Sequence, residues 1–474
     1  MRGSRLRAVD LVDEPPPAAP AAVPATVRGR VIAAAGVALV ALLAVQLTLT
    51  ARQQAADARL AALPGVIRPI GDPPRVAWRG VSQDGAVVAQ GLSWHGVAVG
   101  LRVGDDGSQS VDAIDERTGG TRWSTALLGP DPDRPAAGLV AEGSWCGAVP
   151  GDSPRVACLV TNGYLQDVGP DALVPATVVR LVVLDARDGQ VVLDRPLASG
   201  RRMVVLRRIA VVASTPPDGS LDLVGYDLHT GQVRWRHRVP GGGTGTGARQ
   251  FWRLVATPDR VAVQADTVTV LRDDGRVLHD AAGGRLRPSA FEVSTAGGRI
   301  VIADYGGGPS TVVVRDADVR TVRGIPARVT ADDGSLPGLL LTVDTGVHAW
   351  DAASAAARWD LDIRSTTGAV IFGGRVYLGT AGGVVAVDGG TGTVLWDTED
   401  QRVRVPGAVM TDGHLLFVAD LRATNARPRE LVAYSLTTGR QEWAAPLPPG
   451  VDAVGQLGRL VASWSRGGRL VVLG

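Results

Sequence analysis

The stretch VDGGTGTVLW, residues 387–396, decides the fold because the chain repeats it. It consists of an apolar residue, an Asp, two variable residues, Thr-Gly, three more residues and a Trp. The pattern recurs as IDERTGGTRW (residues 114–123), YDLHTGQVRW (residues 226–235) and YSLTTGRQEW (residues 434–443). Self-similarity of this kind indicates a repeat architecture, which predicts one fold for most of the chain.

Each unit has the composition of a buried strand, a tight turn and a returning strand. Residues 383–387 (GVVAV) are apolar throughout, as expected of a strand covered on both faces. The Asp that follows can accept backbone N–H bonds from the turn, and the Gly tolerates a positive φ. The returning strand carries the Trp to a seam between units. A further hairpin, such as residues 374–379, precedes the unit and makes four strands per repeat.

Weaker copies fill the intervals between the good ones. Residues 184–193 have Leu193 in place of Trp, and residues 350–359 have Ala355 in place of Gly. The copy at residues 271–278 is shortened, and the copy at residues 314–321 keeps only the strand. Four-stranded propeller blades repeat at about 40–50 residues, close to the spacing seen here. The long interval between Asp115 and Asp185 predicts one blade plus insertions that hold both cysteines. The residues assigned to the structural repeat are Asp115, Gly119, Trp123, Asp185, Gly189, Asp227, Gly231, Trp235, Asp351, Trp359, Asp388, Gly392, Trp396, Gly439 and Trp443.

The two ends of the repeat region predict how the ring closes. The chain finishes with strands at residues 459–464 and 469–473, and no outer strand follows them. Residues 75–78 (RVAW) resemble residues 393–396, so a strand carrying Trp78 can complete the last blade. The sequence predicts an all-β fold, an eight-bladed β-propeller over residues 75–474 with four-stranded antiparallel blades. Seven or nine blades are the alternatives.

An apolar segment precedes the repeats. Residues 31–50 contain no charged residue, and twenty residues at 1.5 Å rise span the roughly 30 Å hydrocarbon layer. This predicts one transmembrane helix; a cleaved signal peptide, whose apolar region is about 7–15 residues, is the alternative. More Arg residues precede the segment than closely follow it, which places the N-terminus in the cytoplasm and the propeller outside.

The regions beside this segment have their own composition. Residues 1–30 are rich in Pro and Ala and contain Arg, which predicts a disordered cytoplasmic tail. Residues 51–74 predict a helical stalk and linker, whose helix ends at Pro64-Gly65.

The repeat resembles the pyrroloquinoline-quinone-type propeller repeat, whose consensus is close to A-x-D-x-x-T-G-x-x-x-W. The resemblance covers most of residues 75–474 and implies that the Trp residues dock blade against blade. One branch of this family contains quinoprotein dehydrogenases. The other contains non-catalytic envelope propellers, such as the propeller lipoprotein of the outer-membrane β-barrel assembly machinery. A repeat defines a fold, and function has to come from a site.

Residues that catalysis requires are not recognisable. Dehydrogenases of the family hold calcium with carboxylate and amide oxygens, and no such set, catalytic residue or cofactor site can be assigned here. The six histidines are scattered, which favours surface or turn positions. The net charge of +2 gives no nucleic-acid signature.

Cys146 and Cys158 flank a Gly- and Pro-containing loop, so an antiparallel hairpin would bring them together as a disulfide. Two unrelated buried thiols are the alternative. Such a bond persists in an oxidising compartment, which agrees with a propeller outside the cytoplasm.

These observations favour a monomeric, non-catalytic binding scaffold of the bacterial cell envelope. It would be anchored in the cytoplasmic membrane and bind an envelope protein or a ligand. Two other hypotheses stay open. One is a quinone-cofactor or other small-ligand enzyme. The other is an extracytoplasmic sensor that signals through the N-terminal tail.

Overall fold

The computed structural model describes residue 42 and most of residues 44–474, which form two compact units, Met1–Arg59 and Leu60–Gly474. The residues not described are 1–41, 43, 53–54, 57, 61–62, 64, 91, 132–139, 142, 152–153, 166–172, 241–251, 266, 281–290, 297, 307, 316–317, 364–367, 381–382, 399–408, 423–426, 450, 452–453 and 465–468.

The first unit is described only from residue 42, and its described residues are helical. The predicted tail (residues 1–30) lies outside the described residues, as do residues 31–41 and 43 of the predicted membrane segment. In the part of the chain that is described, no helix is both long enough and apolar enough to cross a membrane.

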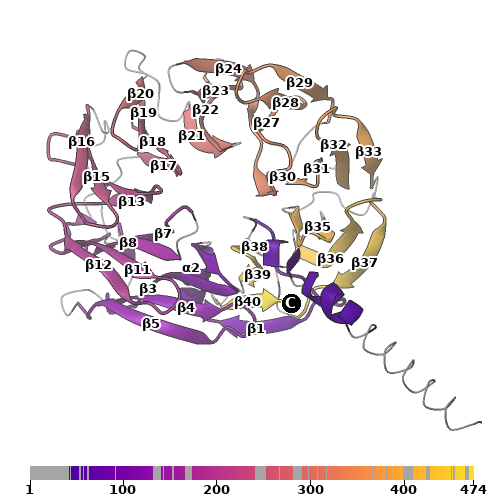
Figure 1. Cartoon of the computed structure of the whole chain (residues 1–474), viewed down its shortest axis with the longest axis horizontal. Coiled ribbons are helices and arrows are strands. Elements are labelled where there is room, and N and C mark those ends of the chain that lie inside the picture. The colour runs from indigo at the N-terminus through magenta and orange to yellow at the C-terminus, as the bar shows by residue number, and fades with distance from the viewer. Residues whose placement is uncertain are drawn as a thin grey trace, which may run out of the picture. The chain divides into compact units, whose positions relative to one another are not determined.

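The second unit contains nine blades in its described residues, each an antiparallel sheet of four strands, with a fifth strand added to one of them. Figure 1 shows the blades around a ring, with the first strand of each blade toward the centre and the last at the rim. The strands alternate direction, so the turn between strands one and two and the turn between strands three and four lie on the same side of the ring. We call this side the turn face.

Blades 1 to 3 follow the N-terminal strand along the chain. From the inner to the outer strand they are β2 (Ser93–Trp94), β3 (Val97–Val103), β4 (Gln109–Asp115) and β5 (Thr121–Leu128); β7 (Trp145–Ala148), β8 (Arg155–Thr161), β11 (Val179–Asp185) and β12 (Val191–Pro196); and β13 (Arg202–Val205), β14 (Ile209–Ser214), β15 (Leu221–Asp227) and β16 (Val233–Val239).

Blades 4 to 6 include the weakest sequence copies. Their strands are β17 (Arg253–Thr257), β18 (Arg260–Gln264), β19 (Val268–Arg272) and β20 (Val277–Asp280); β21 (Phe291–Ala296), β22 (Arg299–Asp304), β23 (Ser310–Val314) and β24 (Val319–Arg323); and β25 (Ile325–Pro326), β27 (Leu339–Val343), β28 (Val347–Asp351) and β29 (Ala357–Leu361).

Blades 7 to 9 complete the ring, and blade 7 carries β26 (Val329–Asp332) as its fifth strand. The other strands are β30 (Gly368–Phe372), β31 (Arg375–Thr380), β32 (Gly383–Asp388) and β33 (Val394–Asp397); β34 (Met410–Thr411), β35 (Leu415–Arg422), β36 (Arg427–Ser435) and β37 (Gln441–Pro446); and β38 (Gly455–Leu457), β39 (Leu460–Trp464), β40 (Leu470–Leu473) and β1 (Val76–Gly80).

The prediction of eight blades is therefore wrong, and nine, one of its two alternatives, are present in the described residues. The two weak copies both form complete blades, β17 to β20 and β21 to β24. A strand needs only an apolar run that can be covered on both faces, as in Val268–Arg272 and Ser310–Val314. The Asp, Gly and Trp residues of the repeat belong to the turn and the seam, so a blade can lose them and keep its sheet.

The ring closes through its two ends. β1 pairs antiparallel with β40, with Trp78 opposite Val472, so the N-terminal strand is the outer strand of blade 9. Helix α2 (Ser82–Ala89) follows β1 and buries Val87 and Val88 against the closing blades. No helix is predicted here from the sequence, because the segment is short and has little amphipathic pattern.

A strap of residues 65–70 packs on the turn face before β1 begins. Val66 and Ile67 are each 1% exposed, and the Ile67 N–H donates to the Thr411 carbonyl at 2.8 Å. The Arg68 N–H donates to the Arg459 carbonyl at 2.8 Å. The strap therefore continues the inner edges of blades 8 and 9, and this part of the predicted linker belongs to the same compact unit as the blades.

Blade 2 contains the insertions that explain the long Asp115–Asp185 interval. β6 (Val140–Ala141), β9 (Tyr164–Leu165) and β10 (Leu173–Val174) form a separate small sheet. The cysteines lie in the blade itself, on β7 and β8, so the prediction that the insertions hold them is wrong. Cys146 lies opposite Cys158 in the ladder and the two form a disulfide, as predicted.

Candidate functional site

The Asp of each repeat organises the turn between the third and fourth strands. Asp227 Oδ1 accepts the N–H groups of His229 and Thr230, both at 2.9 Å, and its Oδ2 accepts from Arg234. Asp115, Asp351 and Asp388 accept the same pair of backbone bonds from their own turns. These carboxylates are engaged by the turn, in the positions that the sequence predicts.

An Arg seven residues after the Asp extends the motif, and sequence reasoning missed it. Arg122, Arg234 and Arg358 each pair with the Asp of their own turn. The Arg122 guanidinium and two backbone N–H groups lower the pKa of Asp115 to about 2 against the opposing effect of burial. Burial raises the pKa of Asp227. The hydrogen bonds from Arg234 and from the turn N–H groups outweigh this effect and lower the pKa to about 2. The signal was available, because an Arg directly precedes the Trp in three copies.

The Trp of one blade lies on the Gly of the next. A Cβ built on Gly392 would be 2.6 Å from the Trp359 ring, and the Trp359 indole N–H donates to the Gly389 carbonyl at 3.0 Å. The φ of Gly392 is +74°, so this position also favours Gly for backbone reasons. The same contact joins Trp78 to Gly119, Trp123 to Gly189, Trp235 to Gly275 and Trp396 to Gly439.

Two exceptions show that the Trp and the Gly depend on each other. Leu193 takes the Trp place before Gly231, and the nearest atom to a Cβ there is 3.2 Å away. At the seam between blades 5 and 6 the Trp place, opposite Val313, is held by Arg320, and the Gly place is held by Ala355. Ala355 keeps a φ of +60°, and its methyl group has room because no indole covers it. The last Trp of the repeat, Trp443, packs beside Phe417 in blade 8.

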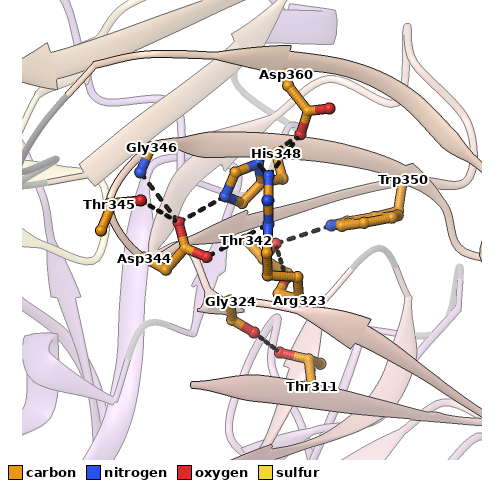
Figure 2. Close-up of polar contacts among 10 residues, drawn as sticks. All are labelled: Thr311, Arg323, Gly324, Thr342, Asp344, Thr345, Gly346, His348, Trp350 and Asp360. Carbon is orange, nitrogen blue, oxygen red and sulfur yellow. Dashed lines mark hydrogen bonds and ion pairs between the residues drawn. The ribbon is translucent and has the colours of Figure 1, made fainter. Parts of the chain in front are cut away.

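A polar cluster holds this exceptional seam together. Figure 2 shows His348 on β28 between Asp344, in the turn after β27, and Asp360 on β29, with Arg323 reaching over from the end of β24. His348 Nε2 lies 2.7 Å from Asp344 Oδ1, and Nδ1 lies 2.5 Å from Asp360 Oδ1. Arg323 contacts Asp344 at 3.4 Å and Asp360 at 3.1 Å, so it joins blade 5 to blade 6. We call these four residues the latch.

The electrostatics of the latch differ between its two ends. The His348 side chain is 5% exposed and that of Asp344 is 12% exposed, whereas those of Asp360 and Arg323 are more than half exposed. The hydrogen bond from His348 lowers the pKa of Asp344 to about 2. Nδ1 faces both a donor, Arg323 Nη2 at 2.7 Å, and an acceptor on Asp360, so protonation of the ring decides which contact is a hydrogen bond.

Two buried threonines support the backbone beneath the latch. The Thr342 hydroxyl donates to the Arg323 carbonyl at 2.6 Å, and the Trp350 indole N–H donates to Thr342 Oγ1 at 2.8 Å. The Thr311 hydroxyl donates to the Gly324 carbonyl at 2.7 Å. The passage from blade 5 to blade 6 is therefore fixed by side chains (Figure 2).

The latch is arranged for holding rather than for proton transfer to a substrate. A general base must reach the proton that it abstracts. Both ring nitrogens of His348 face protein partners, and the ring is buried. The expectation that the histidines lie at the surface or in turns is wrong for His348. Its position in the alternating strand Val347–Asp351 was the available signal.

The calcium set of quinoprotein dehydrogenases has no counterpart among the described residues. No group of three or more His, Cys, Asp or Glu side chains there is arranged to hold a metal ion. The two cysteines are bonded across a β-ladder and are not adjacent in sequence. We therefore derive no step through a quinone.

A cavity of about 230 Å³ opens at the other end of blade 6, on the turn face. Its floor contains Leu339 and Leu341 of β27 and Ile371 of β30, each at most 3% exposed. Its sides come from the β21–β22 hairpin, from β26 and from Gly65 of the strap. Blade 6 thus carries both irregular features of the ring, the latch at one end and the cavity at the other.

This chain is a propeller built from Asp–Thr–Gly–Trp turns. Its residues 322–473 match the family model described as outer membrane protein assembly factor BamB, in agreement with the resemblance of these repeats to the pyrroloquinoline-quinone-type propeller repeat. No curated protein sequence matches the chain significantly.

Solved propellers are similar to the chain at low sequence identity. BamB from Moraxella catarrhalis is 13% identical, with a TM-score of 0.38, over 84% of this chain and 99% of that protein. A quinohemoprotein alcohol dehydrogenase, ADHIIG from Pseudomonas putida HK5, is 12% identical, with a TM-score of 0.39, over 86% of this chain and 77% of that protein. Sqt1 from Saccharomyces cerevisiae is 11% identical, with a TM-score of 0.35, over 68% of this chain and 93% of that protein. The fold assignment rests on the strand pairing rather than on these scores.

Proposed function

We propose that this protein is a non-catalytic scaffold of the bacterial cell envelope, whose propeller binds a protein partner outside the cytoplasm. The observation that carries the proposal is the match of residues 322–473 to the model of an outer membrane protein assembly factor. These residues form blades 6 to 9, which include the latch and most of the cavity lining.

The use of the repeat residues supports the same proposal. The Asp and Trp side chains of the repeat that could serve a ligand are occupied in turns and seams, and the latch presents no ring nitrogen to solvent. What remains for function is the surface of the ring and its exposed strand edges. Recognition of a protein partner needs such a surface and no catalytic group.

The proposed location has the propeller outside the cytoplasmic membrane, held by the apolar segment of residues 31–50 with the N-terminus in the cytoplasm. The disulfide between Cys146 and Cys158 supports an oxidising compartment, since cytosolic thiols are kept reduced. The absence of charge from residues 31–50 supports the anchor.

Thiol trapping at the moment of lysis tests this location. Because Cys146 and Cys158 are buried in the folded protein, the cells are lysed directly into denaturant that contains a maleimide reagent, and the number of modified thiols is read as a mass shift. We expect no modification of the full chain without a reductant, and modification of a variant that lacks residues 31–50, because that variant stays in a reducing compartment. A Cys146→Ser variant, with one free thiol, is the positive control. Free thiols in the full chain would contradict the proposed location.

Purification from native membranes after brief cross-linking tests the binding function. We expect one reproducible envelope protein to accompany the full chain and a variant that lacks residues 1–27. Deletion of residues 75–474 should abolish the association, because the propeller carries it. A partner lost with the tail instead would indicate the sensor hypothesis, and a partner unaffected by either deletion would contradict the scaffold.

A further inference from the structure

The inner strand of blade 6 stops early. β27 is five residues long, but β25 pairs with only two of them, Ile325 with Val343 and Pro326 with Thr342. One further bond follows, from the Ala327 N–H to the Leu341 carbonyl at 2.9 Å. The strand then leaves the blade, so the inner edge of β27 near Leu339 has no neighbouring strand among the described residues. The Leu339 N–H donates to the Leu336 carbonyl of the preceding turn at 3.2 Å, which leaves the Leu339 carbonyl as the group at this edge for a further strand.

The departing chain joins the next blade instead. β26 pairs with β30 in parallel, with Val329 opposite Ala369 and Ala331 opposite Val370. It is the one strand in the described part of the sheets that pairs in parallel with another strand. The Thr330 hydroxyl is 2.7 Å from the Val409 carbonyl and fastens β26 toward blade 8. Blade 7 thereby gains a fifth strand at the expense of blade 6.

The cavity lies where the inner strand of blade 6 would have continued. Its apolar floor is buried, whereas Thr295, Asp332 and Val329 at its sides are exposed, Val329 by 37%. Pockets for drug-sized ligands usually measure about 300–1,000 Å³, so this cavity suits a single side chain better. The exposed carboxylate of Asp332 gives one side a negative charge.

We infer that this place accepts an extended segment of the partner protein. The segment pairs with the inner edge of β27, where β25 stops, and places one aliphatic side chain on Leu339, Leu341 and Ile371. A basic residue next to that side chain faces Asp332. This is strand addition, in which main-chain bonds give affinity and a pocket selects one side chain. The inference rests on the proposed function and names the surface that performs it.

Peptide selection on the full chain in detergent tests the inference. The probe is a displayed library of eight-residue peptides, from which the enriched peptides are synthesised and labelled for titration. We expect enriched peptides with one Val, Leu or Ile beside an Arg or Lys. Hydrogen exchange should show protection confined to the segments that contain residues 337–343 and 327–332. No enrichment, or protection at another blade, would overturn the inference.

A matched pair of variants gives the second measurement. Thr295→Trp puts a large side chain at the cavity from an exposed position and should weaken binding by about 30-fold, the factor for a lost anchor contact. Thr345→Trp makes the same change at an exposed position on the opposite end of blade 6 and should leave binding within about two-fold. Equal affinity of both variants would overturn the inference.

The same pair separates this inference from the proposed function. If cross-linking recovers the envelope partner equally with Thr295→Trp and Thr345→Trp, the strand acceptor fails and the scaffold stands. If the peptides bind as expected but no envelope partner is recovered, the scaffold fails and the acceptor stands.

Discussion

The seam between blades 6 and 7 and the seam between blades 5 and 6 solve the same problem with different chemistry. The first uses Trp359 on Gly392, an apolar contact that requires the absence of a Cβ. The second has Arg320 and Ala355 in those places and relies on Arg323, His348 and two carboxylates. Apolar packing depends on shape, whereas the latch depends on charge and hydrogen bonding. The two seams should therefore respond to different perturbations.

Removal of the indole should separate the two seams most strongly. Trp359→Ala should lower the free energy of unfolding by about 3–5 kcal/mol, because it leaves a cavity between two blades. Arg320→Ala, at the equivalent place on blade 5, should change it by less than about 0.5 kcal/mol, because Arg320 and its ion pair with Asp318 are exposed. Chemical denaturation measures both. Similar losses would mean that the seams are not distinguished by the Trp.

Exchange of Gly and Ala tests the other side of each contact. Gly392→Ala should lower the free energy of unfolding by about 2–4 kcal/mol, because Ala disfavours the positive φ at this position and its methyl group would overlap the Trp359 indole. Ala355→Gly should leave the free energy of unfolding unchanged or raise it by up to about 1 kcal/mol. The substitution removes the cost of a positive φ, but it also increases the conformational entropy of the unfolded chain. Both values come from denaturation midpoints. A large loss for Ala355→Gly would show that its methyl group matters to the seam.

Loss of the latch histidine should have a smaller effect. His348→Ala should cost about 2 kcal/mol, because it leaves the mostly buried Asp344 without its hydrogen-bond donor. Arg323→Ala should cost less than about 1 kcal/mol, since its ion pairs are exposed. His229→Ala, an exposed turn position, is the control. An effect of Arg323→Ala larger than that of His348→Ala would reverse this assignment.

Acid should affect the latch gradually. The folded-state pKa of Asp344 is lowered to about 2, chiefly by the hydrogen bond from His348, below the usual Asp value of about 3.9. A carboxyl with a lowered pKa contributes stability that is complete above its unfolded pKa and is lost as the pH falls through the folded one. We expect the stability of the protein to decline between about pH 4 and pH 2. Asp344→Asn should flatten the decline, as measured by denaturation at each pH.

The sequence predicted the fold class, the closure by Trp78 and the disulfide, because each depends on local pattern or on residues at the chain ends. It did not predict nine blades, because the turn motif is absent from sheets that still form, as in Ser310–Val314. The latch was missed because Arg323, Asp344 and Asp360 meet only after two blades have folded. The strand that leaves blade 6 was missed because Val329–Asp332 can pair with either neighbour, and tertiary packing decides between them.

Hydrogen exchange in blades 6 and 7 tests the central claim most directly. β27 is covered over only part of its inner edge, whereas every residue of β30 pairs with β31. Amides in residues 339–343 should therefore exchange faster than those in residues 375–380, on the order of ten-fold for one missing hydrogen bond of about 1 kcal/mol. Equal protection of the two strands would contradict the account, because blade 6 would then have no open inner edge.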